Sequence, residues 1–247
     1  MTTVPLDASD DAVPAPRWGL GDVVLGWGIA VAAATFLGFA SISLAGYNQA
    51  DIDADRLPLW LTIIQSPFLW VGFFGVPMWA ARAKGYGVVA DFRLRVRAMD
   101  VPIATAIGVL TQLVIVALVT YPVLWLTGTD ADKLGEPARQ LSDKVSGAGG
   151  TFLFVLIVVI GAPIAEELFF RGLFLRSLEN RFGTTWAVVG SSMAFGATHF
   201  QALQFPALTA AGLVFALIVV KTNRLGASMV CHMAFNATTV VNLLWIQ

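Results

Sequence analysis

The side chains most able to do chemistry lie inside one long apolar stretch, residues 151–178. It reads TFLFVLIVVIGAPIAEELFFRGLFLRSL and contains Glu166, Glu167 and Arg171. A carboxylate at membrane depth costs about 2.5–3.5 kcal/mol to insert, and such groups usually face a bundle interior or a water-filled cavity. Glu167 and Arg171 are four residues apart and can pair on a helix. Glu166 is rotated by about 100° and points elsewhere. The spacing therefore predicts one carboxylate with a structural partner and one that is available for chemistry.

Both histidines of the chain also fall inside apolar stretches. His199 ends the sequence FGATH, and His232 begins the sequence HMAFN. Phe195 and His199 are four residues apart, as are His232 and Asn236, so each pair lies on one helix face. Taken singly, an intramembrane His or Asn is often only a contact between helices. Together with the acidic pair, these residues predict a functional site at which three helices converge on a polar cavity.

This set of side chains fits more than one chemistry. A carboxylate such as Glu166, with a neutral imidazole nearby, can deprotonate a water molecule for attack on a carbonyl. His232 and Asn236 can then donate hydrogen bonds to the oxyanion. Glu166, His199 and His232 are also ordinary ligands of Zn²⁺, so a zinc cofactor stays open. Two other classes of function also stay open, namely a proton-coupled transporter with a buried relay and a non-catalytic scaffold or immunity protein.

At these residues the chain resembles the CPBP family, which contains the type II CAAX prenyl endopeptidases and the bacteriocin-processing and abortive-infection proteins. EELFFR (166–171) matches its EExxxR motif, FGATH its FxxxH motif and HMAFN its HxxxN motif, in that order and on separate predicted helices. The resemblance covers residues 150–247 and implies an intramembrane endopeptidase that cleaves a membrane-associated, in some cases lipidated, protein or peptide. In that reading Glu166 activates water with His199, His232 and Asn236 stabilise the oxyanion, and Glu167, Arg171 and Phe195 support the site.

Other intramembrane protease patterns are missing from the sequence. It has no HExxH zinc motif, because FQAL follows His199 and MAFN follows His232. Ser191 and Ser192, in GSSMAFG, do not form a GxSG serine motif, and no GxGD aspartyl motif occurs.

The elements that must position these groups are predicted to be membrane helices. The chain has 247 residues, 57% hydrophobic and 13% charged, whereas a soluble domain carries about 25% charged residues. We predict an all-α polytopic bundle in one domain, 18–247, with a motif-bearing core at 150–247, preceded by a disordered tail, 1–17. About 20 apolar residues span a bilayer, which predicts seven helices at 20–45, 58–81, 101–126, 151–178, 184–200, 203–220 and 225–246.

Prolines and glycines inside these helices carry two further predictions. Proline inside a helix removes a hydrogen bond and can kink the axis, so we expect kinks at Pro67, Pro77, Pro122 and Pro163. Small residues allow membrane helices to approach closely, and this role is predicted for Gly38, Gly72, Gly75 and Gly212.

The basic residues predict the orientation in the membrane, since cytoplasmic loops are enriched in Lys and Arg. Seven spans place eleven of the fifteen on the side of the N-terminus, which we therefore expect in the cytoplasm of a bacterial cell. The other side carries only Arg56, Lys133, Arg139 and Lys144. Segment 85–100 on the basic side is interpreted as a positive loop or as a surface segment that meets anionic lipid. The chain has no basic cluster suited to nucleic acid.

Overall fold

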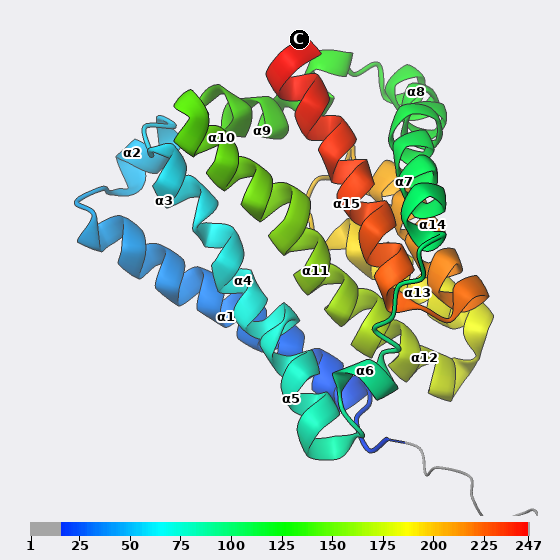
Figure 1. The fold of residues 1–247 in the computed structure, drawn as a ribbon. Helices are drawn as coiled ribbons and strands as arrows, with labels where there is room; N and C mark the ends of the chain where they lie inside the picture. Colours follow the sequence, from blue (N-terminus) through cyan, green and yellow to red (C-terminus); the bar gives the residue numbers. More distant parts are fainter. Residues whose placement is uncertain (1–15, 247) are drawn as a thin grey trace, which may run out of the picture.

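The computed structural model describes residues 16–246, apart from the side chains of Ala131, Asp132 and Leu134. This part of the chain is all-helical, as predicted, with long helices packed side by side (Figure 1). The predicted tail, 1–17, lies outside the described residues except for Pro16 and Arg17. In chain order the helices, with π-helical stretches labelled η, are α1 (Leu20–Leu44), α2 (Gln49–Asp53), α3 (Leu59–Ile63), α4 (Gln65–Phe73), α5 (Gly75–Lys84), α6 (Val88–Asp91), α7 (Asp100–Leu110), η1 (Thr111–Ile115), α8 (Val116–Thr127), α9 (Ala131–Asp143), α10 (Gly147–Val155), η2 (Leu156–Gly161), α11 (Ala162–Glu167), η3 (Leu168–Phe174), α12 (Leu175–Phe182), α13 (Thr184–Ala197), α14 (Phe205–Thr222), α15 (Leu225–Val241) and η4 (Asn242–Ile246).

Six helical stretches are long and apolar enough to cross a membrane, which makes this an integral membrane protein. Their bounds are Leu20–Leu44, Leu59–Lys84, Asp100–Thr127, Gly147–Phe182, Phe205–Thr222 and Leu225–Ile246. The remaining predicted helix, the fifth in chain order at 184–200, is α13, which has 14 residues and packs along α14. At 1.5 Å per residue, α13 reaches only about 21 Å. It forms a short hairpin with α14, and His199 lies two residues beyond the end of α13, in the connection to α14.

Proline explains the breaks in the second membrane-spanning stretch, Leu59–Lys84. Helices α3, α4 and α5 are separated at Ile64 and Phe74, each three residues before Pro67 or Pro77. Proline lacks an N–H donor and its ring clashes with the carbonyl four residues earlier, so the preceding turn opens. Each of these two prolines therefore coincides with an interruption of the helix. Pro122, in contrast, lies inside the continuous helix α8.

The acidic pair lies on a single short α-helical segment between two π-helical stretches. Helix η2 ends at Gly161, two residues before Pro163, and η3 begins directly after Glu167. π-Helical turns interrupt the regular hydrogen-bond ladder and occur frequently at functional sites. The wider turns change the directions of side chains on both sides of Glu166 and Glu167, which places Arg171 inside the bundle.

Glycines set the closest helix contacts, as expected for three of the four that were predicted. A Cβ on Gly72 would lie 2.1 Å from the Gly26 carbonyl oxygen of α1, and one on Gly38 would lie 2.5 Å from Gln65 Oε1. A Cβ on Gly212 would lie 3.2 Å from Arg171 Nη2. The prediction for Gly75 is wrong, because nothing lies within 4 Å of its Cβ position.

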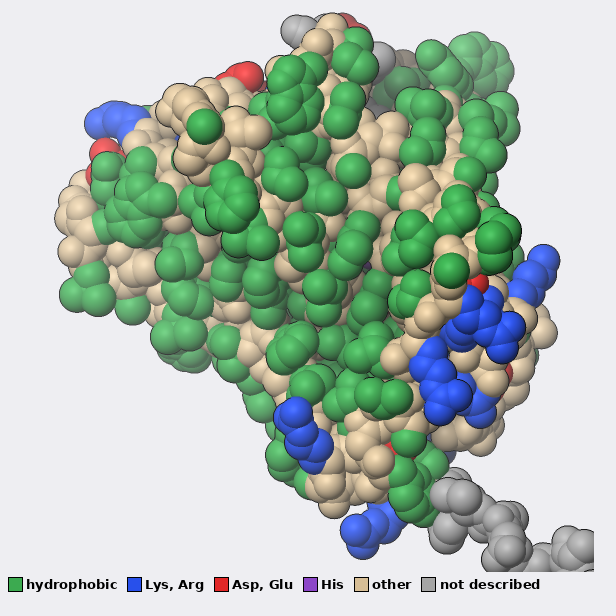
Figure 2. Space-filling view, in the orientation of Figure 1, with side chains coloured by type: hydrophobic (Ala, Val, Ile, Leu, Met, Phe, Trp, Pro, Cys, Tyr) green, Lys and Arg blue, Asp and Glu red, His purple; other side chains and the backbone are tan. Residues whose placement is uncertain are grey.

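The two ends of the bundle differ in charge. Lys and Arg side chains gather near the end formed by α5, α6 and α12, while the sides are largely hydrophobic (Figure 2). Lys84 pairs with Asp22 and Arg224 with Asp100 at this end, which ties α5 to α1 and the α14–α15 turn to α7. At the other end Lys144 pairs with Asp55 at 2.7 Å. A lipid-facing belt with polar ends is the surface that a bilayer requires.

Candidate active site

Glu167 is the most fully bonded polar group inside the bundle. Its Oε1 lies 3.0 Å from Arg171 Nη1 and 3.1 Å from His232 Nδ1, and its Oε2 accepts a 2.6 Å hydrogen bond from Ser228 Oγ. Glu167 and Arg171 have no solvent exposure. The predicted pairing of Glu167 with Arg171 is confirmed. Because a buried charge is tolerated only with partners, Glu167 is a structural anchor that joins η3 to α15.

Arg171 is held by one carboxylate, one carbonyl and several aromatic rings. Its Nη2 donates to the Gly212 carbonyl oxygen of α14 at 3.0 Å. Its guanidinium carbon lies 4.5 Å from the centre of the Phe195 ring and 5.3 Å from that of Phe215. Its Nε and Nη1 make no hydrogen bond of good geometry within the described residues, so Nη1 contributes to the Glu167 pair by charge. The electron-rich ring faces compensate for part of this deficit.

Glu166 is placed very differently from its neighbour. Its side chain is 21% exposed, and His232 Nε2 lies 3.8 Å from its Oε2. That distance is too long for a hydrogen bond. The carboxylate therefore keeps its lone pairs available for a water molecule, as the sequence predicted from the rotation between the two acids.

Phe195 lies where several parts of the site meet. Its ring centre is 5.0 Å from that of His199 and 5.6 Å from that of His232, so both imidazoles contact the same ring. His199 Nδ1 lies 2.8 Å from the Phe195 carbonyl oxygen. A carbonyl only accepts, so Nδ1 must carry the proton. In the neutral ring the Nε2 lone pair of His199 is then free to accept a proton.

His232 is fixed by an acid on one side and an aromatic ring on the other. Nδ1 faces Glu167, Nε2 faces Glu166, and the ring stacks on Phe215 with centres 4.5 Å apart. Asn236 lies one turn further along α15 and donates from Nδ2 to the Val158 carbonyl oxygen at 2.8 Å. Asn236 thereby ties α15 to η2, and its contact in this structure is with the backbone rather than with either acid.

Two residues of the site carry no motif. Ser228 is buried, and its hydroxyl lies within reach of Glu167 and, at 3.1 Å, of the Phe215 carbonyl. A signal for Ser228 exists in the sequence, since Ser228, His232 and Asn236 repeat every four residues along one face of α15. Phe215 lies in an apolar helix of ordinary composition, and nothing in the sequence distinguishes it from a lipid-facing residue.

A zinc site is the alternative that the sequence leaves open. Within residues 16–246, no three His, Cys, Asp or Glu side chains lie together as a metal site requires. A zinc ion held by Glu166, His199 and His232 would need all three donor atoms about 2.0–2.2 Å from one point. The side chains in this conformation do not fit that requirement, so we derive no step through a metal.

Comparisons with known proteins agree with the motif-bearing region. Residues 148–238 match the family model described as "Type II CAAX prenyl endopeptidase Rce1-like", which confirms the predicted resemblance for this part of the chain. A protein of Bacillus subtilis (strain 168) named "Putative membrane peptidase YdiL" is 28% identical over 89 residues. That alignment covers 36% of this chain and 36% of the relative, so the chain matches about a third of that protein's length. No solved structure matches the chain.

Proposed function

We propose that this chain, whose residues 148–238 match the Rce1-like type II CAAX prenyl endopeptidase family, is an intramembrane endopeptidase. It hydrolyses a peptide bond of a membrane-associated protein or peptide, in the manner of CAAX processing. One observation carries the proposal, namely the difference between the two adjacent acids. Glu167 contacts three side chains, Arg171, His232 and Ser228. Glu166 is partly exposed and has no side-chain partner within hydrogen-bond distance among the described residues. A scaffold would have no need to leave one acid of the pair unbonded.

The proposed reaction uses Glu166 as the general base. Its carboxylate takes a proton from a water molecule, while the oxygen attacks the carbonyl carbon of the substrate and forms a C–O bond. The free Nε2 of His199 orients that water. Protonated Glu166 then returns its proton to the departing nitrogen as the C–N bond breaks. The charge on the chain's own groups is the same before and after the cycle.

The carbonyl oxygen becomes negatively charged during this attack and needs donors. The second amide N–H of Asn236 is one candidate, and His232 is another when its ring carries both protons. Glu167 accepts from His232 Nδ1 and so fixes the orientation of the ring. Glu167, Arg171 and Phe195 act in this proposal as positioning residues.

The distribution of basic residues also implies an orientation of the protein in the membrane. The end of the bundle rich in Lys and Arg (Figure 2) faces the cytoplasm in our proposal, in line with the positive-inside rule. The N-terminal end of α1 lies at this end, since Asp22 pairs with Lys84. Labelling of single cysteines introduced at Arg17 and at Lys144 in intact cells would test this assignment, because only the second is expected to react with a membrane-impermeant reagent.

A cleavage assay tests the function. The purified protein would be incubated with a prenylated CAAX peptide and with several leader-type membrane peptides, with and without a zinc chelator, and the products identified by mass spectrometry. Glu166→Gln should lower cleavage by about 10²–10⁴-fold, the usual contribution of a general base, without lowering thermal stability. Cleavage by Glu166→Gln at the wild-type rate would refute the assignment. Loss of cleavage with chelator would restore the zinc alternative, and a wild-type protein that cleaves no peptide of the panel would favour the scaffold.

Matched variants of the two acids separate base from anchor. Glu167→Gln keeps the shape of the side chain but removes the charge that pairs with Arg171. We expect lower thermal stability for Glu167→Gln and normal stability for Glu166→Gln. The opposite result, with Glu166→Gln as the unstable variant, would reverse the roles that we assign to the two acids.

A further inference from the structure

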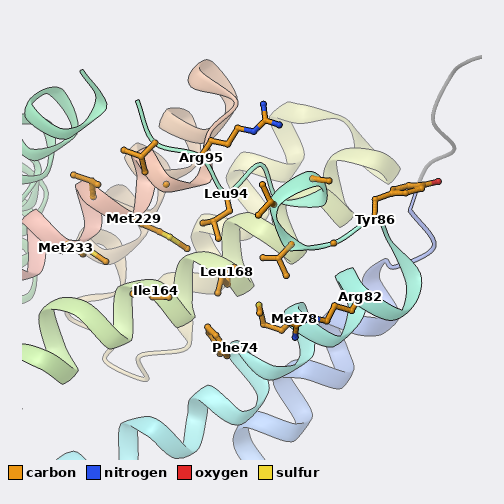
Figure 3. A pocket seen from close by; sticks show the side chains of 17 residues that line it. Phe74, Met78, Arg82, Tyr86, Leu94, Arg95, Ile164, Leu168, Met229 and Met233 are labelled. Atoms are coloured by element: carbon orange, nitrogen blue, oxygen red, sulfur yellow. The ribbon is translucent and has the colours of Figure 1, made fainter. Parts of the chain in front are cut away.

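The segment between α6 and α7 separates two spaces of opposite character at the basic end of the bundle. Residues 93–97 form no regular helix or strand and read Arg93, Leu94, Arg95, Val96, Arg97. Arg93 has a φ of 52°, and the Arg95 amide donates to the Arg93 carbonyl oxygen at 2.8 Å. Leu94 points toward the helices and Arg95 away from them (Figure 3). The segment thus places the half-buried Leu94 toward the bundle and the exposed Arg95 guanidinium toward the polar end.

The space on the bundle side is an apolar groove of about 890 Å³. Its walls are Met78 of α5, Ile164 and Leu168 of α11 and η3, and Met229 and Met233 of α15, which face a common space (Figure 3). Along α15 the groove runs from Gly226 to Met233, about 10 Å at 1.5 Å per residue. That length is comparable with most of one leaflet of a hydrocarbon core about 30 Å thick.

The space on the other side is a basic pocket of about 830 Å³. Four arginines line it, Arg93, Arg95, Arg97 and Arg224, together with the polar residues Thr222 and Asn223. The groove and the pocket share the lining residues Val89, Ala90, Arg95 and Val96. They therefore meet along this segment, and a molecule with an apolar part and an anionic part could occupy both.

The positive charge of the pocket is not balanced by the described residues. Arg224 binds Asp100, with Nε 2.7 Å from Oδ2. The side chains of Arg93 and Arg95 form no hydrogen bond or ion pair with any residue in 16–246. Guanidinium groups pair well with phosphate because their planar N–H donors match its oxygens. An anion would balance the excess charge.

The segment is fixed in place before any ligand binds. The Leu225 amide donates to the Arg93 carbonyl oxygen at 3.1 Å, and a Cβ on Gly226 would lie 2.6 Å from the Arg95 carbonyl oxygen. On the other side of α6, Asp91 accepts from the indole of Trp18 at 3.1 Å. A site that is already ordered pays little entropy on binding.

We infer that the groove and the basic pocket together bind one anionic phospholipid molecule of the cytoplasmic leaflet. Arg93, Arg95 and Arg97 hold the phosphate of the headgroup, and an acyl chain lies in the groove. A free phosphate would use only the pocket, and a zwitterionic lipid carries a cation that the arginines repel. The acyl chain would contact Ile164 and Leu168, on the helix that carries Glu166, and Met233, which follows His232.

Direct lipid binding tests the inference without any assay of cleavage. Binding of dioleoyl phosphatidylglycerol to the purified full chain in detergent would be measured by native mass spectrometry and by titration with a fluorescent analogue. Dioleoyl phosphatidylcholine and glycerol phosphate would serve as competitors. We expect phosphatidylglycerol to bind at least ~10-fold more tightly than phosphatidylcholine, given about 1 kcal/mol for each basic residue that meets an anionic lipid. Equal affinities for the two lipids would overturn the inference.

Two charge variants separate a site from general attraction. Arg93→Gln/Arg95→Gln/Arg97→Gln should weaken phosphatidylglycerol binding at least ~10-fold. Arg17→Gln/Arg181→Gln/Lys221→Gln removes the same charge from exposed positions at the same end and should change the affinity less than 2-fold. Equal losses in the two triple variants would show only non-specific attraction and would refute a defined site.

A third variant tests the junction of the two spaces. Ala90 is exposed and lines both of them, so Ala90→Trp should obstruct the passage without entering the core. We expect a loss of phosphatidylglycerol binding of about 10-fold with unchanged thermal stability. Wild-type affinity in Ala90→Trp, or displacement of the lipid by an equal concentration of glycerol phosphate, would show that the groove takes no part.

Discussion

The α1–α4 contact and the second half of the bundle, α10–α15, are held together by different kinds of contact. Helices α1 and α4 approach each other through Gly26, Ala30 and Gly72, with a single long hydrogen bond of 3.3 Å from Gln65 Nε2 to Ser41 Oγ. The helices of the second half meet around a buried ion pair, Glu167–Arg171, with bonds to α14 and α15. The α1–α4 contact rests on close packing of backbones, whereas the second half adds a buried ion pair to close packing such as that of Gly212 against Ser192.

The difference follows from the solvent. Lipid is as apolar as a leucine side chain, so apolar burial contributes little to helix association in a membrane. Packing of small residues is one remaining source of stability, and interhelical polar contacts are the other. Packing alone suffices where no chemistry is needed. In our proposal the second half bears the active site. There Arg171, His232 and Ser228 make the buried carboxylate of Glu167 tolerable.

The largest expected effect of a substitution is therefore in the charged half. Arg171→Met leaves Glu167 buried without its cation and should lower the free energy of unfolding by about 3–5 kcal/mol. Unfolding in detergent can be followed through the fluorescence of the eight Trp residues. The double variant Glu167→Gln/Arg171→Met removes both charges and should recover a large part of the loss. A single variant as stable as wild type would mean that the pair does not hold this half together.

Charged groups and packing contacts also differ in how well the sequence predicts them. Charges inside apolar stretches are conspicuous, so Glu166, Glu167, Arg171 and both histidines were found as site candidates, and the seven helices were located within a few residues. Ser228 was missed, because a serine in a membrane helix is common and its role depends on which helix it faces. The Gly75 prediction was wrong for a similar reason, since glycine shows where two helices can approach but not whether a partner is present.

Substitutions of Gly72 and Gly75 test whether close packing is the basis of the α1–α4 contact. A Cβ at Gly72 would lie 2.1 Å from the Gly26 carbonyl oxygen and 2.4 Å from the Ala30 nitrogen, both backbone atoms that cannot move aside. Gly72→Ala should therefore cost about 1–3 kcal/mol of unfolding free energy through overpacking. Gly75→Ala meets nothing within 4 Å and should be neutral or stabilising by up to about 1 kcal/mol. Equal effects of the two substitutions would contradict close packing as the basis of the α1–α4 contact.

A smaller loss than at Arg171 or Gly72 is expected at Ser228, where a substitution tests how far the charged network depends on each member. Ser228 has one hydroxyl proton and two acceptors, Glu167 Oε2 at 2.6 Å and the Phe215 carbonyl at 3.1 Å. Ser228→Ala removes this donor, but Arg171 and His232 still contact Oε1 of the same carboxylate. We therefore expect a loss of about 1–2 kcal/mol in unfolding free energy, within the range for a buried hydrogen bond.

Ser191 supplies the matched control for this prediction. It is also buried, but its hydroxyl donates at 3.4 Å to the Val188 carbonyl within its own helix, so Ser191→Ala should change stability by less than about 0.5 kcal/mol. If the loss in Ser228→Ala equalled that in Arg171→Met, the network would fail as a unit whenever any member is removed. If Ser228→Ala were as neutral as Ser191→Ala, the ion pair would hold Glu167 without the serine. The polar face of α15 formed by Ser228, His232 and Asn236 would then serve the substrate rather than the fold.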